Sequence, residues 1–253
     1  MQIVIPMSGL GSRFVAAGYE DIKPLIKVAG KPIIEYVVSL FPGETNFLFI
    51  CNKDHLDNTA LRSELERIMP TGKIVGVEPA KKGPVWAVLS AQEHIQEHEP
   101  VIVNYCDFFA LWDYSAFKQL TAITACAGAI PCYIGFHPHL LGPNLYASCK
   151  IDADQNLIEI REKYSWTENK MDSYQSDGTY YFKSGQLVKK YFQQLVDEDI
   201  NLNGEYYVSL VYNLLVWDHL PVKISTVEKF CQWGTPEDLQ EFVYWQDYFT
   251  QPQ

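Results

Sequence analysis

Short apolar runs and longer amphipathic stretches alternate through the first half of this chain. The apolar runs predict strands and the amphipathic stretches predict helices, because the two patterns follow the periods of the two structures. The predicted strands are residues 2–7, 46–51, 73–77 and 101–105, and the predicted helices are 32–40, 54–69, 84–96 and 113–127. Strands that alternate with helices form parallel sheets covered on both faces. We therefore expect an α/β fold with a mostly parallel central sheet flanked by helices.

The second half has a more antiparallel character. Its predicted strands are 128–136, 146–151, 157–163, 178–182 and 222–226, and its predicted helices are 185–197, 205–216 and 236–248. Residues 152–155 form a predicted turn between two of these strands, as in a hairpin. We expect a single domain over 1–253, in which residues 128–253 add a smaller antiparallel lobe to the sheet of residues 1–127.

A glycine turn follows the first predicted strand directly. Gly9, Gly11, Ser12 and Arg13 come after the apolar run that ends at Met7 and Ser8. Glycines let the backbone approach a phosphate closely, free N–H groups point at the anion, and an arginine adds a bidentate cation. The spacing matches neither G-x-x-x-x-G-K-[ST] nor G-x-G-x-x-G, so a Walker P-loop is excluded and a dinucleotide fold is disfavoured. Taken alone, the motif predicts either a polyphosphate site or a simple turn.

Other polar residues also follow predicted strands. Ligands of open parallel sheets bind beyond the carboxyl ends of the strands, where the glycine turn, Gly83 and Asp107 would converge. Asp107 ends the strand V-I-V-N-Y-C-D and is placed to hold Mg²⁺ against phosphate oxygens, the alternative being a helix cap or turn residue. Lys163, in E-I-R-E-K, is either a solvated edge residue or a ligand. Glu205 is either a helix-terminal acid or a ligand.

Composition narrows the classes of function. The net charge of −11 and the pI of about 5.0 argue against general nucleic-acid binding, so a phosphate site needs a local group of cations and a metal. The 6 cysteines lack C-x-x-C spacing, which favours free thiols in a reducing compartment. We find neither an apolar run of membrane-spanning length nor a signal peptide, and we expect a cytoplasmic protein that binds no membrane.

Taken together, these motifs resemble the signature of the sugar nucleotidylyltransferases, or nucleoside-diphosphate-sugar pyrophosphorylases. The resemblance spans nearly the whole chain in the right order. Its segments are G-L-G-S-R at 9–13, K-P-L at 23–25, V-A-G-K-P-I-I at 28–34, Asp107, E-K at 162–163, G-T-Y-Y at 178–181 and G-T-P-E-D-L at 234–239. The fold it implies is the nucleotide-binding α/β architecture shared with GT-A glycosyltransferases. Two segments, N-G-E-Y-Y-V-S-L-V-Y-N and W-G-T-P-E-D-L, are similar to small enzymes of capsule and surface-polysaccharide pathways, some of them cytidylyltransferases.

The resemblance implies a reaction in which a phosphorylated acceptor, such as a sugar 1-phosphate, attacks an NTP and releases pyrophosphate. CTP is the favoured NTP on the branch resemblance alone, and Mg²⁺ is the implied cofactor. Residues 1–127 would form the nucleotide-binding half and 128–253 the acceptor-binding half. The implied catalytic residues are Arg13 and Lys23 on the phosphates, Asp107 on the metal and Lys163 on the acceptor phosphate. Met7, Ser8, Gly9, Gly11, Ser12 and Gly83 would bind the nucleotide, and Tyr146, Lys163, Thr179 and Glu205 the acceptor.

One position departs from the family pattern. Many members carry a second metal-binding aspartate two residues before the G-T pair, where this chain has Gln232, a poor Mg²⁺ ligand. Either Glu205 or another acid replaces it, or a single protein carboxylate binds the metal. Two alternatives stay open: a glycosyltransferase, although the chain has Tyr105-Cys106-Asp107 in place of D-x-D, and a non-catalytic nucleotide-binding relative. The sequence does not name the base, the acceptor or the oligomeric state, and a homo-oligomer is compatible with it.

Overall fold

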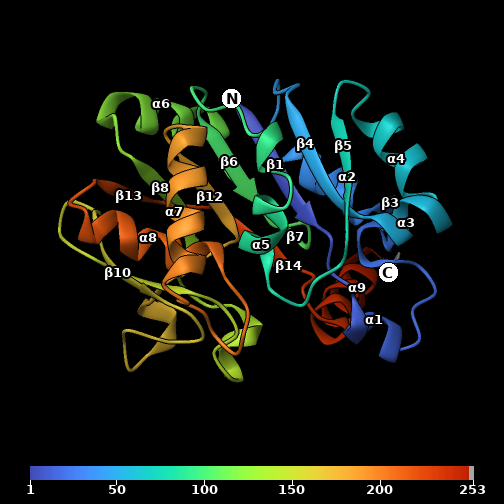
Figure 1. Ribbon diagram of the computed structural model, residues 1–253. Coiled ribbons are helices and arrows are strands. Elements are labelled where there is room, and N and C mark those ends of the chain that lie inside the picture. The colour runs from blue at the N-terminus through green and yellow to red at the C-terminus, as the bar shows by residue number, and fades with distance from the viewer. Residues whose placement is uncertain (251–253) are drawn as a thin grey trace.

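The computed structural model describes residues 1–250, and a ten-stranded mixed sheet forms its centre (Figure 1). The strand order is β10-β9-β11-β8-β12-β6-β1-β4-β5, with β13 paired to β8. The pairs β1–β4, β1–β6, β4–β5 and β8–β13 are parallel, and the remaining pairs of the sheet are antiparallel. Its strands are β1 (Gln2–Met7), β4 (Phe47–Asn52), β5 (Lys73–Val77), β6 (Val101–Asn104), β8 (Gly128–Tyr133), β9 (Ser148–Ile151), β10 (Leu157–Arg161), β11 (Tyr174–Ser176), β12 (Thr179–Phe182) and β13 (Val222–Thr226).

Helices cover the sheet, and two small antiparallel pairs stand outside it. In Figure 1, α7 crosses in front of the sheet, and α1 and α9 lie at the end of the molecule opposite the N-terminus. The helices are α1 (Ser12–Ala16), α2 (Ile33–Ser39), α3 (Lys53–Asn58), α4 (Leu61–Ile68), α5 (Pro84–Leu89), α6 (Tyr114–Thr124), α7 (Gly185–Asp197), α8 (Val208–Trp217) and α9 (Pro236–Thr250). The small pairs are β2 (Lys27–Val28) with β3 (Lys31–Pro32) and β7 (Phe108–Leu111) with β14 (Lys229–Gln232).

Alternate residues of the central strands enter two separate hydrophobic cores. In β1, Ile3 and Ile5 pack into the core on one face of the sheet, and Val4 packs into the core on the other. In β4, Phe49 and Ile50 divide in the same way. This follows from the period of two along a strand. Because both faces are buried, these strands read as continuous apolar runs, as expected for a covered sheet.

The fold class expected from the sequence is confirmed: it is mixed α/β, with a large central sheet flanked by helices. The antiparallel strands β8 to β12 continue the same sheet, so one sheet receives strands from both halves of the chain. Among residues 1–250, no helix combines the length and apolar character needed to cross a membrane.

Several element boundaries differ from the prediction. The helix expected over 54–69 is two helices, because Thr59 leaves helical geometry and its hydroxyl accepts a hydrogen bond from the Leu61 N–H at 3.2 Å. The helix expected over 84–96 ends at Leu89 and is followed by a single 3₁₀ turn, Gln92–His94. The pair β7–β14 was not predicted, because its two strands are short and far apart in the sequence. Its paired residues are separated by at least 118 positions, the smallest separation being that of Leu111 and Lys229.

Candidate active site

Two adjoining cavities open at the carboxyl ends of β1 and β6. The larger has a volume of about 470 Å³ and the smaller about 220 Å³. Residues that line both cavities form their common wall: Arg13, Tyr105, Asp107, Tyr207 and Gly234. A molecule in one cavity therefore lies next to a molecule in the other.

The glycine turn borders the larger cavity along its whole length. Met7 and Ser8 end β1, and Gly9 to Arg13 continue the lining. Gly11 has φ +62°, the left-handed region that glycine adopts without strain, and it precedes the five-residue helix α1. This turn places Arg13 in the first turn of α1, from which it reaches both cavities.

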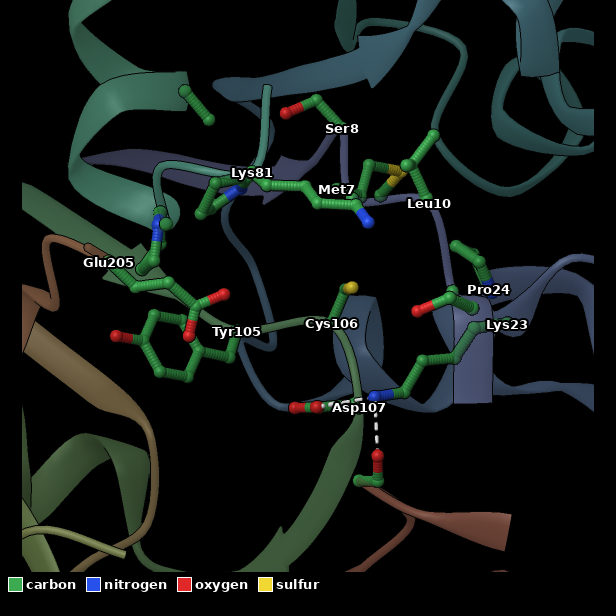
Figure 2. A pocket seen from close by; sticks show the side chains of 18 of the residues that line it. Met7, Ser8, Leu10, Lys23, Pro24, Lys81, Tyr105, Cys106, Asp107 and Glu205 are labelled. Carbon is green, nitrogen blue, oxygen red and sulfur yellow. Dashed lines mark hydrogen bonds and ion pairs between the residues drawn. The ribbon is translucent and has the colours of Figure 1, made fainter. Parts of the chain in front are cut away.

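Lys23 and Asp107 form an ion pair at the common wall. The Lys23 ammonium donates to Asp107 Oδ2 at 2.7 Å and to the carbonyl oxygen of Gly234 at 2.9 Å. Both bonds appear as dashed lines in Figure 2, which also shows Glu205 and Tyr105 on the opposite side of the cavity. The side chains are 17% and 30% exposed, so the pair is partly shielded from water and open to a ligand. In the sequence, Asp107 lies 84 residues and Gly234 lies 211 residues from Lys23. Three distant segments of the chain therefore meet at one ammonium group.

The β7–β14 pair explains why Gly234 lies beside Asp107. Phe108 pairs with Gln232 in register, so the residues next to them on each strand meet as well. The Trp233 N–H donates to the Asp107 carbonyl oxygen at 2.9 Å, which fixes the two segments to each other. The G-T turn before α9 is thus held against the strand end that carries Asp107.

Gly83 closes the larger cavity on the side of Glu205. It has φ +84°, and a Cβ atom there would lie 2.7 Å from the backbone oxygen of Tyr206. The Tyr206 N–H donates to Lys82 O at 2.9 Å, and the Val85 N–H donates to Tyr206 O at 3.1 Å. Only glycine permits this close approach, which holds Glu205 at the cavity, where Tyr207 donates a hydrogen bond to its carboxylate.

The smaller cavity contains Lys163 and Tyr146 together with the buried Asp177 and the partly buried Glu162. Lys163 has φ +51°, and its N–H donates to Tyr146 O at 3.0 Å. Burial raises the pKa of Glu162 and of Asp177 to about 7 each, against hydrogen bonds from Ser209 and Thr179 that lower it. Among residues 1–250, neither cavity lining includes Thr179, whose hydroxyl instead donates to Asn104 Oδ1 at 2.7 Å.

Asp107 is the candidate ligand for a metal ion in this site. Residues 1–250 contain no cluster of three or more His, Cys, Asp or Glu side chains that could hold a metal ion. Mg²⁺ commonly takes one or two carboxylates and completes its shell with phosphate oxygens and water, so Asp107 at the common wall fits that donor set. Gln232 lines the smaller cavity, and its amide donates to Asp238 Oδ1 at 2.6 Å. Whether Glu205 joins Asp107 stays a prediction.

Some lining residues had no sequence signal of their own. Tyr105 and Tyr207 line both cavities, and His55 and Lys81 line the larger one. Tyr105, Lys81 and Tyr207 stand within two residues of Asp107, Gly83 and Glu205, so neighbourhood in the sequence was their only signal, and His55 had none. Burial raises the pKa of Cys106, another lining residue, to about 12, which keeps its thiol protonated at neutral pH.

Known structures share this fold over almost the whole chain. A nucleoside-diphosphate-sugar pyrophosphorylase from Vibrio cholerae superposes with a TM-score of 0.77 at 19% identity, covering 96% of this chain and 99% of that one. The inositol-1-phosphate CTP transferase of T. maritima gives 0.72 at 16% identity, with coverages of 96% and 92%. A UDP-glucose pyrophosphorylase complexed with UDP-glucose gives 0.75 at 15% identity, with 99% of both chains covered. No curated protein sequence matches the chain significantly.

The fold is the one that nucleotide-sugar transferases share. The family model described as the MobA-like NTP transferase domain matches residues 3–169, which is more than half of the chain. The protein belongs to this family and is a nucleotidyltransferase. The family resemblance stated from the sequence motifs is confirmed at this level.

Proposed function

We propose that this enzyme transfers a nucleotidyl group from an NTP, with CTP favoured, to a small phosphorylated acceptor and releases pyrophosphate. The observation that carries the proposal is the common wall, where Arg13 and Asp107 face both cavities. A nucleotide in the larger cavity and an acceptor in the smaller one would meet there. The inositol-1-phosphate CTP transferase and the sugar pyrophosphorylases of the same fold support this class of reaction.

In the proposed reaction, an oxygen of the acceptor phosphate attacks the α-phosphorus, and the bond to the β-phosphate breaks. Pyrophosphate leaves with the electron pair of that bond, and no covalent enzyme intermediate forms. Catalysis then consists of positioning and charge neutralisation, as in phosphoryl transfer generally. The glycine turn holds the β- and γ-phosphates, Arg13 neutralises the departing pyrophosphate, and Lys163 holds the acceptor phosphate.

Lys23 has a double role in this proposal. Its ammonium is 2.7 Å from Asp107 and would turn to the α-phosphate when the nucleotide enters. That movement would free the Asp107 carboxylate for Mg²⁺, which when bound would neutralise phosphate charge. Gly83 would place backbone groups at the base, and Tyr146, which lines the smaller cavity, would contribute to the acceptor side. Of the other two residues implied for the acceptor, Glu205 lines only the larger cavity and Thr179 lines neither, within the part of the chain that the structure describes.

The cellular setting is part of the same proposal. The branch resemblance of the N-G-E-Y-Y and W-G-T-P-E-D-L segments supports a role in capsule or surface-polysaccharide precursor synthesis. NTPs and phosphorylated metabolites supplied inside the cell would place the enzyme in the cytoplasm, as a single nucleotidyltransferase domain over 1–253 that acts alone or as a homo-oligomer.

A pyrophosphate-release assay tests the proposal. CTP, GTP, UTP, dTTP and ATP are each combined with sugar 1-phosphates and small phosphorylated alcohols in the presence of Mg²⁺. We expect release from at least one pair, fastest with CTP. The proposal fails if no pair releases pyrophosphate while a nucleotide sugar is hydrolysed or transferred, since that pattern belongs to a glycosyltransferase.

A further inference from the structure

Two carboxylates in the smaller cavity have no cationic partner. Asp177 is 3% exposed and Glu162 is partly buried, and both line the cavity. Asp177 Oδ1 accepts the Thr179 N–H at 2.8 Å, and Glu162 accepts the Ser209 hydroxyl. Within residues 1–250, neither acid belongs to an ion pair of 4.0 Å or less. Buried carboxylates are normally paired or coordinate a cation.

The third acid of the cavity shows the contrast. Asp107 lines the same cavity, and its charge is neutralised by Lys23 at 2.7 Å. Lys163 follows Glu162 in sequence and is exposed, and its charge lowers the pKa of Glu162 only against the larger effect of burial. Among the described residues, Glu162 and Asp177 therefore lack the cationic partner that Asp107 has.

Aromatic rings line the same cavity as these two acids. Tyr105, Tyr146 and Tyr207 are partly exposed and line the cavity. Tyr180 and Phe230 line the cavity as well: the Tyr180 ring lies 5.4 Å from the Tyr105 ring and the Phe230 ring 5.9 Å from the Tyr146 ring, measured between centroids. Burial, followed by the charge of Glu162, raises the pKa of the Tyr180 hydroxyl. Faces of aromatic rings attract cations, most strongly where water is excluded.

The cavity also has positively charged side chains, which suit the phosphate end of an acceptor. Arg13 and Lys163 line it as well, and they match the phosphate that the proposed reaction requires. We infer that the acceptor is a phosphate ester that also carries an ammonium group, such as the phosphate of a small amino alcohol. Its phosphate lies toward Arg13 and Lys163, and its ammonium group lies among the tyrosine rings near Glu162 and Asp177. This inference rests on the proposed function and adds the class of acceptor to it.

A matched pair of acceptors tests the inference without any mutation. Phosphocholine and 3,3-dimethylbutyl phosphate have nearly the same shape, and only the first carries a positive charge. Phosphoethanolamine and propyl phosphate form a second such pair, and glucose 1-phosphate represents neutral sugars. With the nucleotide that gives the fastest release, we expect kcat/KM for a cationic ester to exceed that for its neutral partner roughly tenfold or more.

The outcomes separate the inference from the proposed function. Equal or faster release with a neutral partner or with glucose 1-phosphate overturns the inference and leaves the nucleotidyltransferase reaction intact. No release with any acceptor and any of the five nucleotides overturns both.

Variants of the two acids test where the ammonium group of the acceptor binds. Asp177→Asn and Glu162→Gln remove charge with little change of shape, and each is expected to lower the preference for the cationic ester severalfold, without a matching loss for the neutral one. Glu168→Gln makes the same chemical change at an exposed position and is the control. An unchanged preference in both cavity variants, with each variant folded by circular dichroism, contradicts the placement of the cation.

Discussion

The Lys23 side chain connects two other segments of the site. Its ammonium group joins Asp107, at the end of a central strand, to the carbonyl of Gly234, at the turn before α9. A partly buried ion pair of this kind contributes little net stability, because desolvation offsets the attraction. Its value to the enzyme is therefore positional: it keeps a cation and a carboxylate at the common wall, where phosphate charge would develop.

Replacing Asp107 by asparagine should separate chemistry from folding. The amide can still accept from Lys23 and keeps the shape, while the negative charge that suits Mg²⁺ is lost. We expect kcat to fall by about 10²-fold or more, the range for loss of one electrostatic group, with the melting temperature nearly unchanged. Steady-state pyrophosphate release and differential scanning fluorimetry check this. Wild-type turnover in the variant would remove Asp107 from the metal site.

Gly83 permits a sharper stability test. Gly83→Ala introduces a Cβ atom 2.7 Å from Tyr206 O and also places alanine at φ +84°. Gly43→Ala meets nothing within 4 Å at φ +85°, so it carries the backbone strain without the collision. We expect a loss of roughly 1 kcal/mol for Gly43→Ala and about 2–4 kcal/mol for Gly83→Ala in urea unfolding. Equal losses would show that the Gly83–Tyr206 contact is not tight.

At the scale of elements, the short strand β14 anchors the turn that carries Gly234. It pairs with β7 and continues into Trp233, whose side chain is 1% exposed. The indole stacks on Phe109 at 6.4 Å and meets the Tyr36 ring edge-on at 5.2 Å. The backbone of Gly234, which accepts from Lys23, is thereby anchored by the large side chain that precedes it.

Trp233→Ala should weaken both stability and catalysis. Removing a fully buried indole leaves a cavity, which costs about 3–5 kcal/mol, and it releases the turn that orients Lys23. Trp217→Ala serves as the control, because Trp217 in α8 is 60% exposed and should change stability by about 0.5 kcal/mol or less. Chemical denaturation and kcat measured well below the midpoint check this. Activity at the wild-type level in the folded Trp233 variant would mean that the turn needs no such anchor.

The elements also show what the sequence could and could not predict. Strands β1, β4 and β6 are apolar except for one polar residue at an end of each, because both faces of the sheet are covered, and their ends were predicted nearly to the residue. The β7–β14 pair is too short for periodicity to detect, and its strands meet only in the tertiary structure. The break at Thr59 depends on a local hydroxyl contact that competes with the helix, which a periodic apolar face does not report.

At the scale of the whole molecule, one sheet built from both halves of the chain brings the predicted site residues together. Arg13, Lys23 and Asp107 from the first half meet Lys163 and Tyr146 from the second around the two cavities. Of these, Asp107 was expected at the end of a strand and Arg13 in the turn after the first strand, and both lie next to those strand ends. The acids Glu162 and Asp177 were not predicted as unpaired charges, because burial and the absence of a neighbouring cation are properties of the assembled structure.

Those two acids also determine a pH dependence of the whole molecule. Burial raises the folded-state pKa of Asp177 from 3.8, and that of Glu162 from 4.5, to about 7 each. Between these pH values the folded state binds more protons than the unfolded state, so the free energy of unfolding falls as the pH rises toward 7. Each unit of pKa difference corresponds to about 1.4 kcal/mol. This contribution is constant below about pH 4 and is fully lost above the folded pKa.

Asp177→Asn should remove its share of that dependence. The amide oxygen can still accept the Thr179 N–H, so the variant is expected to equal the wild type in stability near pH 4 and to exceed it at pH 8. Urea unfolding at pH 4.5, 6 and 8 measures the difference between the two proteins, which cancels the contributions of all other titrating groups. Asp154→Asn, the same chemical change at an exposed position, is the control. If the difference for Asp177→Asn is also flat across this range, the carboxylate ionises in the folded protein as it does in water, and the smaller cavity supplies compensation for its charge that the described side chains do not.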